Sequence, residues 1–202
     1  MKILGANNPK FPEGDKGIIE AAKYIKLVAL DIDGVLTDGR IVYGLGVGEE
    51  AKFFDVKDGA GIKFMQRQGI IVGCISGRES FANKRRAEEL KLDFLIEHCR
   101  DKLETMRKLC TEYKLDIGEC AMIGDDLIDC ETFVNCGIGV AVGDAANDAL
   151  DYADLHCDAR GGRGAIREFA EWLLKEQDKW RDTLAYYHLQ PRSGKSADGV
   201  EN

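Results

Sequence analysis

The stretch Lys26-Leu27-Val28-Ala29-Leu30-Asp31-Ile32-Asp33-Gly34 decides the fold. An apolar run stops abruptly at two acidic residues and a glycine. A short apolar run that ends at polar turn residues is typical of a parallel strand buried on both faces. We therefore predict a buried strand over residues 26–30, with Asp31 and Asp33 at its C-terminal end.

The same pattern recurs along the chain, where apolar runs alternate with segments of helical periodicity. Further strands are predicted at 70–74, 94–96, 120–123 and 138–142, and helices at 20–24, 60–68, 81–90, 102–113, 129–134, 145–150 and 165–180. This alternation predicts an α/β fold with a three-layer, Rossmann-like parallel sheet, whose sites lie at the C-terminal ends of the strands. Residues 39–54 break the alternation, because two strand patterns around a glycine-rich turn predict a β-hairpin.

Length and composition limit the class of protein. The 202 residues suit a single domain over 1–180, followed by a C-terminal tail over 181–202 whose polar end is expected to be disordered. The net charge of -8 argues against nucleic acid or an anionic membrane as the main partner. Seven cysteines without a Cys-x-x-Cys pair favour reduced core thiols, so we expect a cytoplasmic protein.

Two acidic motifs follow predicted strands: Asp31-Ile32-Asp33-Gly34-Val35-Leu36-Thr37-Asp38 and Gly124-Asp125-Asp126-Leu127-Ile128-Asp129. Crowded carboxylates are unfavourable unless a cation neutralises them or they take up protons. If the two strands are neighbours, these oxygen ligands suit Mg²⁺. Between the motifs, Ser76 offers a hydroxyl and Lys102 a positive charge, which are groups that phosphoryl transfer needs. A carboxylate nucleophile forms an aspartyl phosphate that water then hydrolyses.

The four motifs, in this order, resemble the haloacid dehalogenase superfamily. From about residue 24 to residue 174 the chain also resembles the 3-deoxy-D-manno-octulosonate 8-phosphate (Kdo 8-phosphate) phosphatases, through the stretches 31–39, 55–59, 76–78 and 161–168. In that family a short hairpin replaces the large cap domain and builds a homotetramer, which the 39–54 stretch matches. The resemblance implies a Mg²⁺-dependent phosphomonoesterase that acts on a sugar-acid phosphate in lipopolysaccharide precursor synthesis.

The resemblance also implies roles for residues at matching positions. Asp31 would be the nucleophile and a metal ligand, and Asp33 would protonate the leaving alkoxide, activate water and bind the metal through its carbonyl. Asp125 would be the third protein ligand of the metal, supported by Asp126 and Asp129. Ser76 and Lys102 would hold the phosphoryl oxygens, and Gly161–Arg167 would close over a neighbouring subunit's site. The residues implied to contact the substrate are Asp33, Asp55, Val56, Lys57, Asp58, Gly59, Lys63, Arg78, Arg86 and Lys102.

Taken one at a time, these residues also fit turn acids, helix caps and solvated surface cations. Within the phosphatases, a nine-carbon, sialic-type acid 9-phosphate is an alternative substrate, although Arg78 favours the eight-carbon acid. A signalling receiver domain and a non-catalytic phosphatase-like module remain alternatives of other classes. Receivers place their acidic pair before a lone acceptor aspartate, whereas here the Asp-x-Asp motif comes first.

Overall fold

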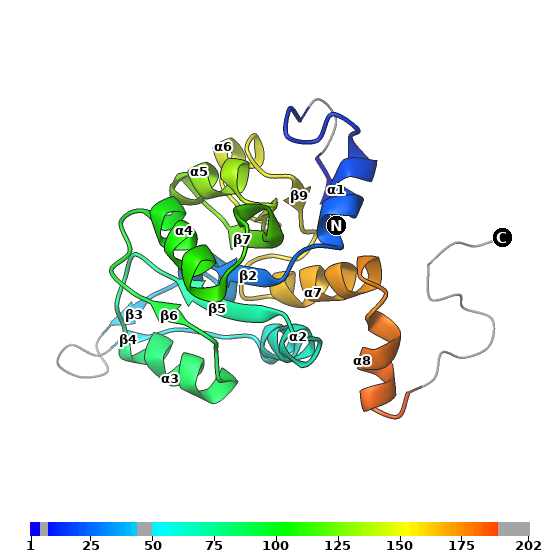
Figure 1. Cartoon of the computed structure of the whole chain (residues 1–202). Helices are drawn as coiled ribbons and strands as arrows, with labels where there is room; N and C mark the ends of the chain where they lie inside the picture. Colours follow the sequence, from blue (N-terminus) through cyan, green and yellow to red (C-terminus); the bar gives the residue numbers. More distant parts are fainter. Residues whose placement is uncertain (5–7, 44–49, 190–202) are drawn as a thin grey trace.

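A computed structural model describes residues 1–4, 8–43 and 50–189 (Figure 1). Among these residues, a central sheet has the strand order β1-β9-β8-β7-β2-β5-β6, and only the β1–β9 pair is antiparallel. Its strands are β1 Lys2–Ile3, β2 Leu27–Leu30, β5 Ile71–Ile75, β6 Leu95–Ile96, β7 Cys120–Gly124, β8 Ile138–Ala141 and β9 Leu155–His156. The predicted parallel α/β sheet is confirmed.

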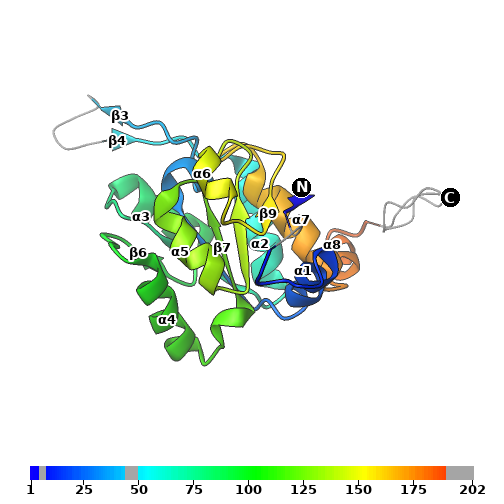
Figure 2. The same cartoon turned by 90° about the horizontal axis from the view of Figure 1, so that it is seen from above.

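Helices cover both faces of this sheet (Figures 1 and 2). Helices α1, α2 and α7 pack on one face, and α4 and α5 pack on the other. In β2, Val28 and Leu30 belong to the first core, whereas Leu27 and Ala29 belong to the second, so the strand needs apolar residues at every position. The helices are α1 Asp15–Ala22, α2 Val56–Arg67, α3 Phe81–Leu90, α4 Lys102–Tyr113, α5 Leu127–Asn135, α6 Asn147–Leu150, α7 Ala165–Glu176 and α8 Trp180–Tyr186.

The position of β2 determines where polar groups meet. Strand β2 lies between β5 and β7, and Leu30 pairs with Cys74 on one side and with Ile123 on the other. The loops that follow these three strands therefore leave the sheet at the same edge. The chain runs outward from β2 to β5 and β6 and then crosses over to β7, so the topological switch point lies beside β2.

A small antiparallel hairpin leads away from the sheet (Figure 2). Strand β3, Val42–Tyr43, pairs with β4, Glu50–Ala51, and Thr37 pairs with Phe54 at the base. The predicted hairpin over 39–54 is confirmed in this part, while its glycine-rich turn at 44–49 lies outside the described residues.

Several helix boundaries differ from the sequence prediction: the helix predicted over 20–24 is α1, Asp15–Ala22, and two further differences concern α2 and α7. The helix predicted over 60–68 begins earlier, at Val56, because the side chain of Asp55 caps it by accepting from the Lys57 amide at 2.7 Å. The helix predicted over 165–180 ends at Glu176, and Asp178 adopts a φ of 56° before α8 begins. The start of α2 and the end of α7 thus depend on local geometry, a helix cap and a positive φ, rather than on the apolar pattern.

The aromatic C-terminal stretch packs against the body of the domain. The ring of Phe64 in α2 lies 5.9 Å from that of Trp180 and 5.6 Å from that of Tyr187. The guanidinium of Arg67 lies 4.3 Å from the ring centroid of Tyr186. The expected domain boundary at residue 181 therefore falls inside α8, and the expected disorder of 193–202 lies outside the described residues.

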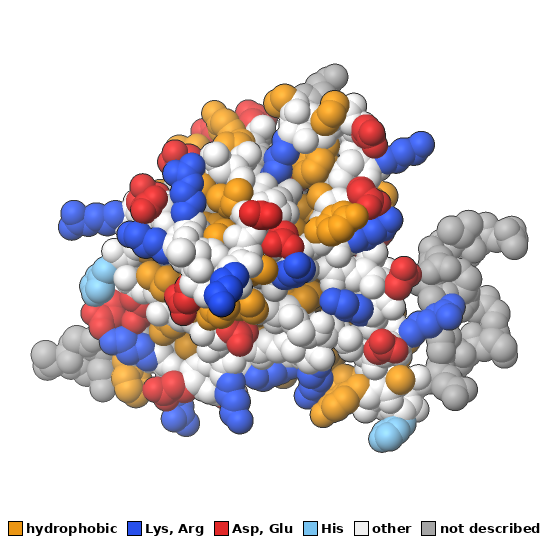
Figure 3. All heavy atoms as spheres, viewed as in Figure 1, with side chains coloured by type: hydrophobic (Ala, Val, Ile, Leu, Met, Phe, Trp, Pro, Cys, Tyr) orange, Lys and Arg blue, Asp and Glu red, His pale blue; other side chains and the backbone are white. Residues whose placement is uncertain are grey.

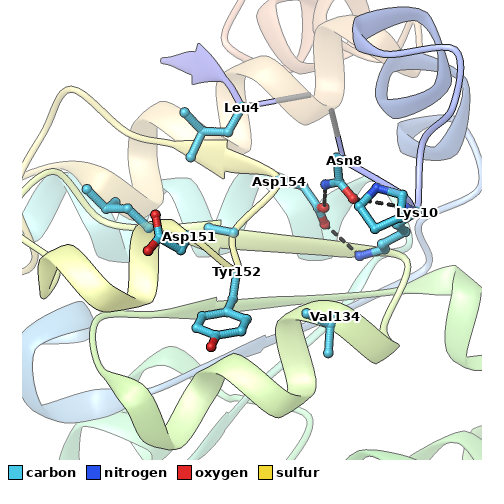
Figure 4. Close-up of a pocket in the computed structure, with 10 residues that line it drawn as sticks. Leu4, Asn8, Lys10, Val134, Asp151, Tyr152 and Asp154 are labelled. Atoms are coloured by element: carbon cyan, nitrogen blue, oxygen red, sulfur yellow. Dashed lines mark hydrogen bonds and ion pairs between the residues drawn. The ribbon is translucent and has the colours of Figure 1, made fainter. Parts of the chain in front are cut away.

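Asp154 anchors the N-terminal segment, for which the sequence offered no prediction (Figure 4). Its carboxylate accepts from Asn8 Nδ2 at 2.6 Å, from Lys10 Nζ at 2.6 Å and from the Gly139 amide at 2.7 Å. These groups lie beside a hollow of about 880 Å³ that Leu4, Val134 and Tyr152 also line. The cluster joins the chain start to β8 and β9.

The described surface carries charges of both signs. Lysine and arginine side chains are interspersed with aspartate and glutamate over the face shown in Figure 3. Within the described ranges, every helix is too short or too polar to cross a lipid bilayer.

Candidate active site

Asp31 lies buried at the end of β2, and its amide donates to the Ile123 carbonyl at 2.9 Å. Lys102, the first residue of α4, reaches this carboxylate from the side. Its Nζ lies 3.0 Å from Asp31 Oδ1 and 2.6 Å from Asp129 Oδ1. The ammonium is itself buried, with 3% of its side chain exposed, so it pairs with two carboxylates in a site of low dielectric.

Asp31, Asp125 and Asp129 form an acidic cluster whose ligand oxygens lie within 4.8 Å of one another. Burial raises the pKa of Asp31 to about 6 and that of Asp125 to about 7, and the neighbouring carboxylates add to both shifts. Burial lowers the pKa of Lys102, but Asp31 and Asp129 outweigh that effect and raise it overall. Three carboxylates thus share one charged lysine, which leaves an excess of negative charge that a divalent cation fits.

The backbone around this cluster is shaped for close approach of its oxygens. Gly34 has a φ of 99°, and a Cβ there would lie 2.0 Å from Asp125 Oδ2. The Asp125 and Asp126 amides donate to Asp129 Oδ2 at 3.1 and 3.4 Å. Asp129 therefore fixes both Lys102 and the loop that presents Asp125. Because the donors are carboxylate oxygens, the cluster suits a hard cation such as Mg²⁺.

Ser76 follows β5 and is buried at the same edge. Its Oγ accepts from the Arg78 amide at 3.2 Å, which orients the hydroxyl within the turn. Because a hydroxyl both accepts and donates, Ser76 can still donate to a phosphoryl oxygen.

Asp33 meets two cations on the side of the hairpin. Lys52 Nζ lies 2.7 Å from Asp33 Oδ1, and Arg78 Nε lies 3.8 Å from Oδ2. Arg78 also reaches Glu50 at 3.2 Å, which ties the end of β4 to the site. Sequence reasoning missed Lys52; the available signal is the two-residue spacing of Glu50, Lys52 and Phe54, which places them on one face of an extended segment.

Several residues expected to contact the substrate gather at the start of α2. Arg86 Nη2 donates to the Asp55 carbonyl at 3.2 Å, and Gly59 makes room for it, since a Cβ there would lie 2.6 Å from Nη2. Val56 and Lys57 are exposed in the same turn.

Asp58 and Lys63 face other parts of the fold. Asp58 is fully buried and accepts from the Gly164 and Arg167 amides, both at 3.0 Å, so it caps α7. Lys63 Nζ donates to the Leu90 carbonyl, at the end of α3 that points away from the site, and to Gln66. The structure thus gives both side chains structural partners and does not bring them to the Asp31 cluster.

The Gly161–Arg167 segment supports the Asp31 loop of the same chain. The Gly162 amide donates to the Val35 carbonyl at 2.8 Å. A Cβ at Gly161 would lie 1.6 Å from the Gly34 carbonyl oxygen, so only glycine permits this contact. The expected contact of this segment with a neighbouring subunit's site stays a prediction.

Aspartates and a lysine that converge at the ends of adjacent parallel strands are the arrangement of a haloacid dehalogenase-like hydrolase, and the family model with that description matches residues 95–166. The chain is 38% identical, over 80% of its length and 86% of the relative, to 3-deoxy-D-manno-octulosonate 8-phosphate phosphatase KdsC of Yersinia pestis. It belongs to the family of 3-deoxy-D-manno-octulosonate 8-phosphate phosphatases.

Solved structures agree with this family. The phosphatase of Moraxella catarrhalis, crystallised with a magnesium ion, a phosphate ion and KDO, superposes with a TM-score of 0.82 at 36% identity, covering 86% of this chain and 99% of that one. The cobalt-bound form of the Haemophilus influenzae enzyme has a TM-score of 0.75 at 35% identity, covering 79% of this chain and 92% of that one.

Proposed function

We propose that this chain hydrolyses 3-deoxy-D-manno-octulosonate 8-phosphate to Kdo and phosphate, with Mg²⁺ and a phosphorylated Asp31. The observation that carries the proposal is the buried Asp31 carboxylate, 3.0 Å from Lys102, within a cluster whose excess negative charge calls for a cation. Membership of the family supports the substrate, and the magnesium, phosphate and KDO in the Moraxella relative support the same ligand set.

The residues divide the chemistry between them. A carboxylate oxygen of Asp31 attacks phosphorus while the bond between phosphorus and the sugar oxygen breaks, and Ser76 and Lys102 hold the phosphoryl oxygens. Asp33 gives a proton to the leaving alkoxide and then takes one from the water that hydrolyses the aspartyl phosphate. When bound by Asp31, Asp125 and the Asp33 carbonyl, Mg²⁺ supplies positive charge that offsets the charge of the phosphate.

The sugar acid brings a carboxylate as well as a phosphate. Arg78 is half exposed beside Asp33 and presents a planar guanidinium suited to a carboxylate. Arg86 and Lys57 offer further positive charge at the start of α2. Substrate contacts at residues 55–59 belong to this proposal, with Asp58 acting through the α7 cap rather than directly.

The hairpin is the proposed assembly element. Val42 and Tyr43 are 38% and 69% exposed on β3, which leads away from the body of the domain. Exposed apolar and aromatic side chains on a projecting element are typical of an interface, so we propose a homotetramer built through 39–54. A cytoplasmic location likewise remains a proposal, made from the cysteine content.

The decisive experiment measures phosphate release from purified protein with Mg²⁺. It compares Kdo 8-phosphate, a nine-carbon sialic-type acid 9-phosphate and an aryl phosphate, with Asp31→Asn as the control. We expect the highest kcat/KM with Kdo 8-phosphate and its loss in the variant. Preference for the nine-carbon ester would keep the mechanism and replace the substrate. Failure to release phosphate from any of the three, with the fold intact, would leave the receiver or non-catalytic module.

A further inference from the structure

Lys52 is an unusual lysine, because its side chain is fully buried. The residue directly follows β4, and its side chain is 0% exposed. An ammonium loses several kcal/mol of hydration on burial unless nearby groups pair with it. Hydrogen-bonding or charged partners must therefore fix this side chain in one place.

Asn83 of α3 supplies the first of these partners and sets the position of Lys52. Lys52 Nζ donates to Asn83 Oδ1 at 3.0 Å. The amide of Asn83 is oriented by its own bonds, since Nδ2 donates to Glu97 Oε1 at 3.1 Å and to the Arg78 carbonyl at 3.4 Å. Lys52 is thus anchored by α3 independently of the catalytic loop.

From this anchored position, Lys52 meets Asp33. Its Nζ lies 2.7 Å from Asp33 Oδ1 and 3.5 Å from Glu50 Oε1. The other oxygen, Oδ2, faces the more distant and half-exposed Arg78 at 3.8 Å. Oδ1 is therefore held by a close ion pair, whereas Oδ2 is buried and has no hydrogen-bond partner among the described residues, which leaves it available for the leaving group.

We propose that Lys52 is a positioning residue: it fixes Oδ1 of Asp33 so that Oδ2 is aimed at the leaving-group oxygen. The inference rests on the proposed function, in which Asp33 transfers a proton to the alkoxide. Proton transfer requires hydrogen-bond reach, and a misplacement of about 1 Å costs on the order of 10²-fold in rate. Lys52 also explains how the base of the hairpin contributes to the chemistry.

The leaving group distinguishes a positioning role from a structural one. An alkyl alkoxide is a poor leaving group and needs the proton from Asp33, whereas p-nitrophenolate leaves without one. Because kcat/KM reports the first irreversible step, a misdirected Asp33 lowers it for alkyl esters far more than for an aryl ester. A general loosening of the site lowers both values together.

The test compares kcat/KM of Lys52→Met for Kdo 8-phosphate and for p-nitrophenyl phosphate. We expect a loss of roughly 100-fold with the sugar ester and of less than about 5-fold with the aryl ester. Lys52→Gln keeps N–H donors and should recover part of the loss. Lys84→Met, at an exposed lysine of α3 paired with Glu79, is the matched control and should leave both values unchanged.

A double-mutant cycle with Asp33→Asn completes the test. Once Asp33 is removed, Lys52→Met should cost almost nothing further, because the two residues act through one contact. Equal losses with both esters, no loss with either, or full additivity with Asp33→Asn would each overturn the proposal. Thermal melting of every variant separates unfolding from these outcomes.

Failure of the proposed function gives a different result. If the wild-type chain prefers the nine-carbon ester, the substrate assignment fails. The loss of kcat/KM in Lys52→Met is then compared between that alkyl ester and p-nitrophenyl phosphate, which tests the positioning role in the same way. If the wild-type chain hydrolyses aryl but no alkyl esters, Asp33 has no alkoxide to protonate, and the positioning role falls with the function.

Discussion

Asp31 and Asp154 are both buried aspartates next to the central sheet, but their surroundings differ. Asp154 is 1% exposed and receives three donors, from Asn8, Lys10 and Gly139, so its charge is matched. Asp31 is 5% exposed and shares Lys102 with Asp129, while Asp125 adds a further negative charge. A matched carboxylate holds the fold together, whereas a cluster left with excess charge marks the place where a cation and a phosphate bind.

The largest expected effect comes from replacing each of the two aspartates by asparagine and comparing the two variants. Asp31→Asn should lower kcat/KM by at least about 10⁴-fold, because it removes the nucleophile. In metal-free buffer at pH 8 its melting temperature should stay equal or rise, since the substitution relieves repulsion in the acidic cluster. Kinetics and thermal melting measure both effects.

Asp154→Asn should show the opposite pattern. It breaks the contact with Lys10 and presents an amide to donors, so we expect a loss of about 3 kcal/mol in the free energy of unfolding. Activity per folded molecule should stay near that of the wild type. Urea unfolding measures the loss, and a stable but inactive Asp154→Asn would break the comparison.

A smaller effect is expected at Gly161 and Gly162, which support the Asp31 loop. Gly161→Ala puts a Cβ 1.6 Å from the Gly34 carbonyl oxygen, so the Asp31 loop must shift. We expect a fall in kcat of roughly 100-fold, on the scale of a 1 Å displacement of catalytic groups. Gly118→Ala is the control, because a Cβ there meets nothing within 4 Å. Equal activity of the two variants would contradict the supporting role.

The smallest effect concerns pH and magnesium. The folded chain raises the pKa of Asp31 to about 6 and that of Asp125 to about 7, above their ordinary value of 3.8. Their contribution to stability is therefore fully present below about pH 4 and is lost as the pH rises through 6 and 7. Mg²⁺ should raise the melting temperature by several degrees more at pH 8 than at pH 5.5, because protons compete with it at the lower pH. Equal gains at both values, measured by thermal shift, would argue against a cation at these carboxylates.

The sequence predicted the elements that carry their own local signals. The helices 81–90 and 102–113 have the expected bounds, because Ser80 and Asp101 cap their first turns. The strand ending at Leu30 was predictable because burial on both faces excludes polar residues from it. The convergence of Asp31 and Asp125 followed from the rule that such sites lie at strand ends.

The remaining features depend on contacts between distant residues. Strands β1 and β9 have two residues each, too few for a pattern, and long-range backbone bonds such as that from the Leu4 amide to the Asp154 carbonyl hold them together. The sequence predicts Asp58 only as a substrate contact, but in the structure its carboxylate caps α7 by accepting from the Gly164 and Arg167 amides. Lys52 has the pattern of a surface lysine in the sequence, and only the fold brings it into contact with Asn83 and Asp33.

The contact of Gly161 and Gly162 with the Asp31 loop also has a consequence for the order of synthesis. The loop leaves the ribosome well before its backbone partner does. Closing contacts between such distant segments is slow, and it can begin only when both are available. A nascent chain that ends before Gly161 therefore carries every proposed catalytic side chain and still lacks the backbone contacts that hold the Asp31 loop in place.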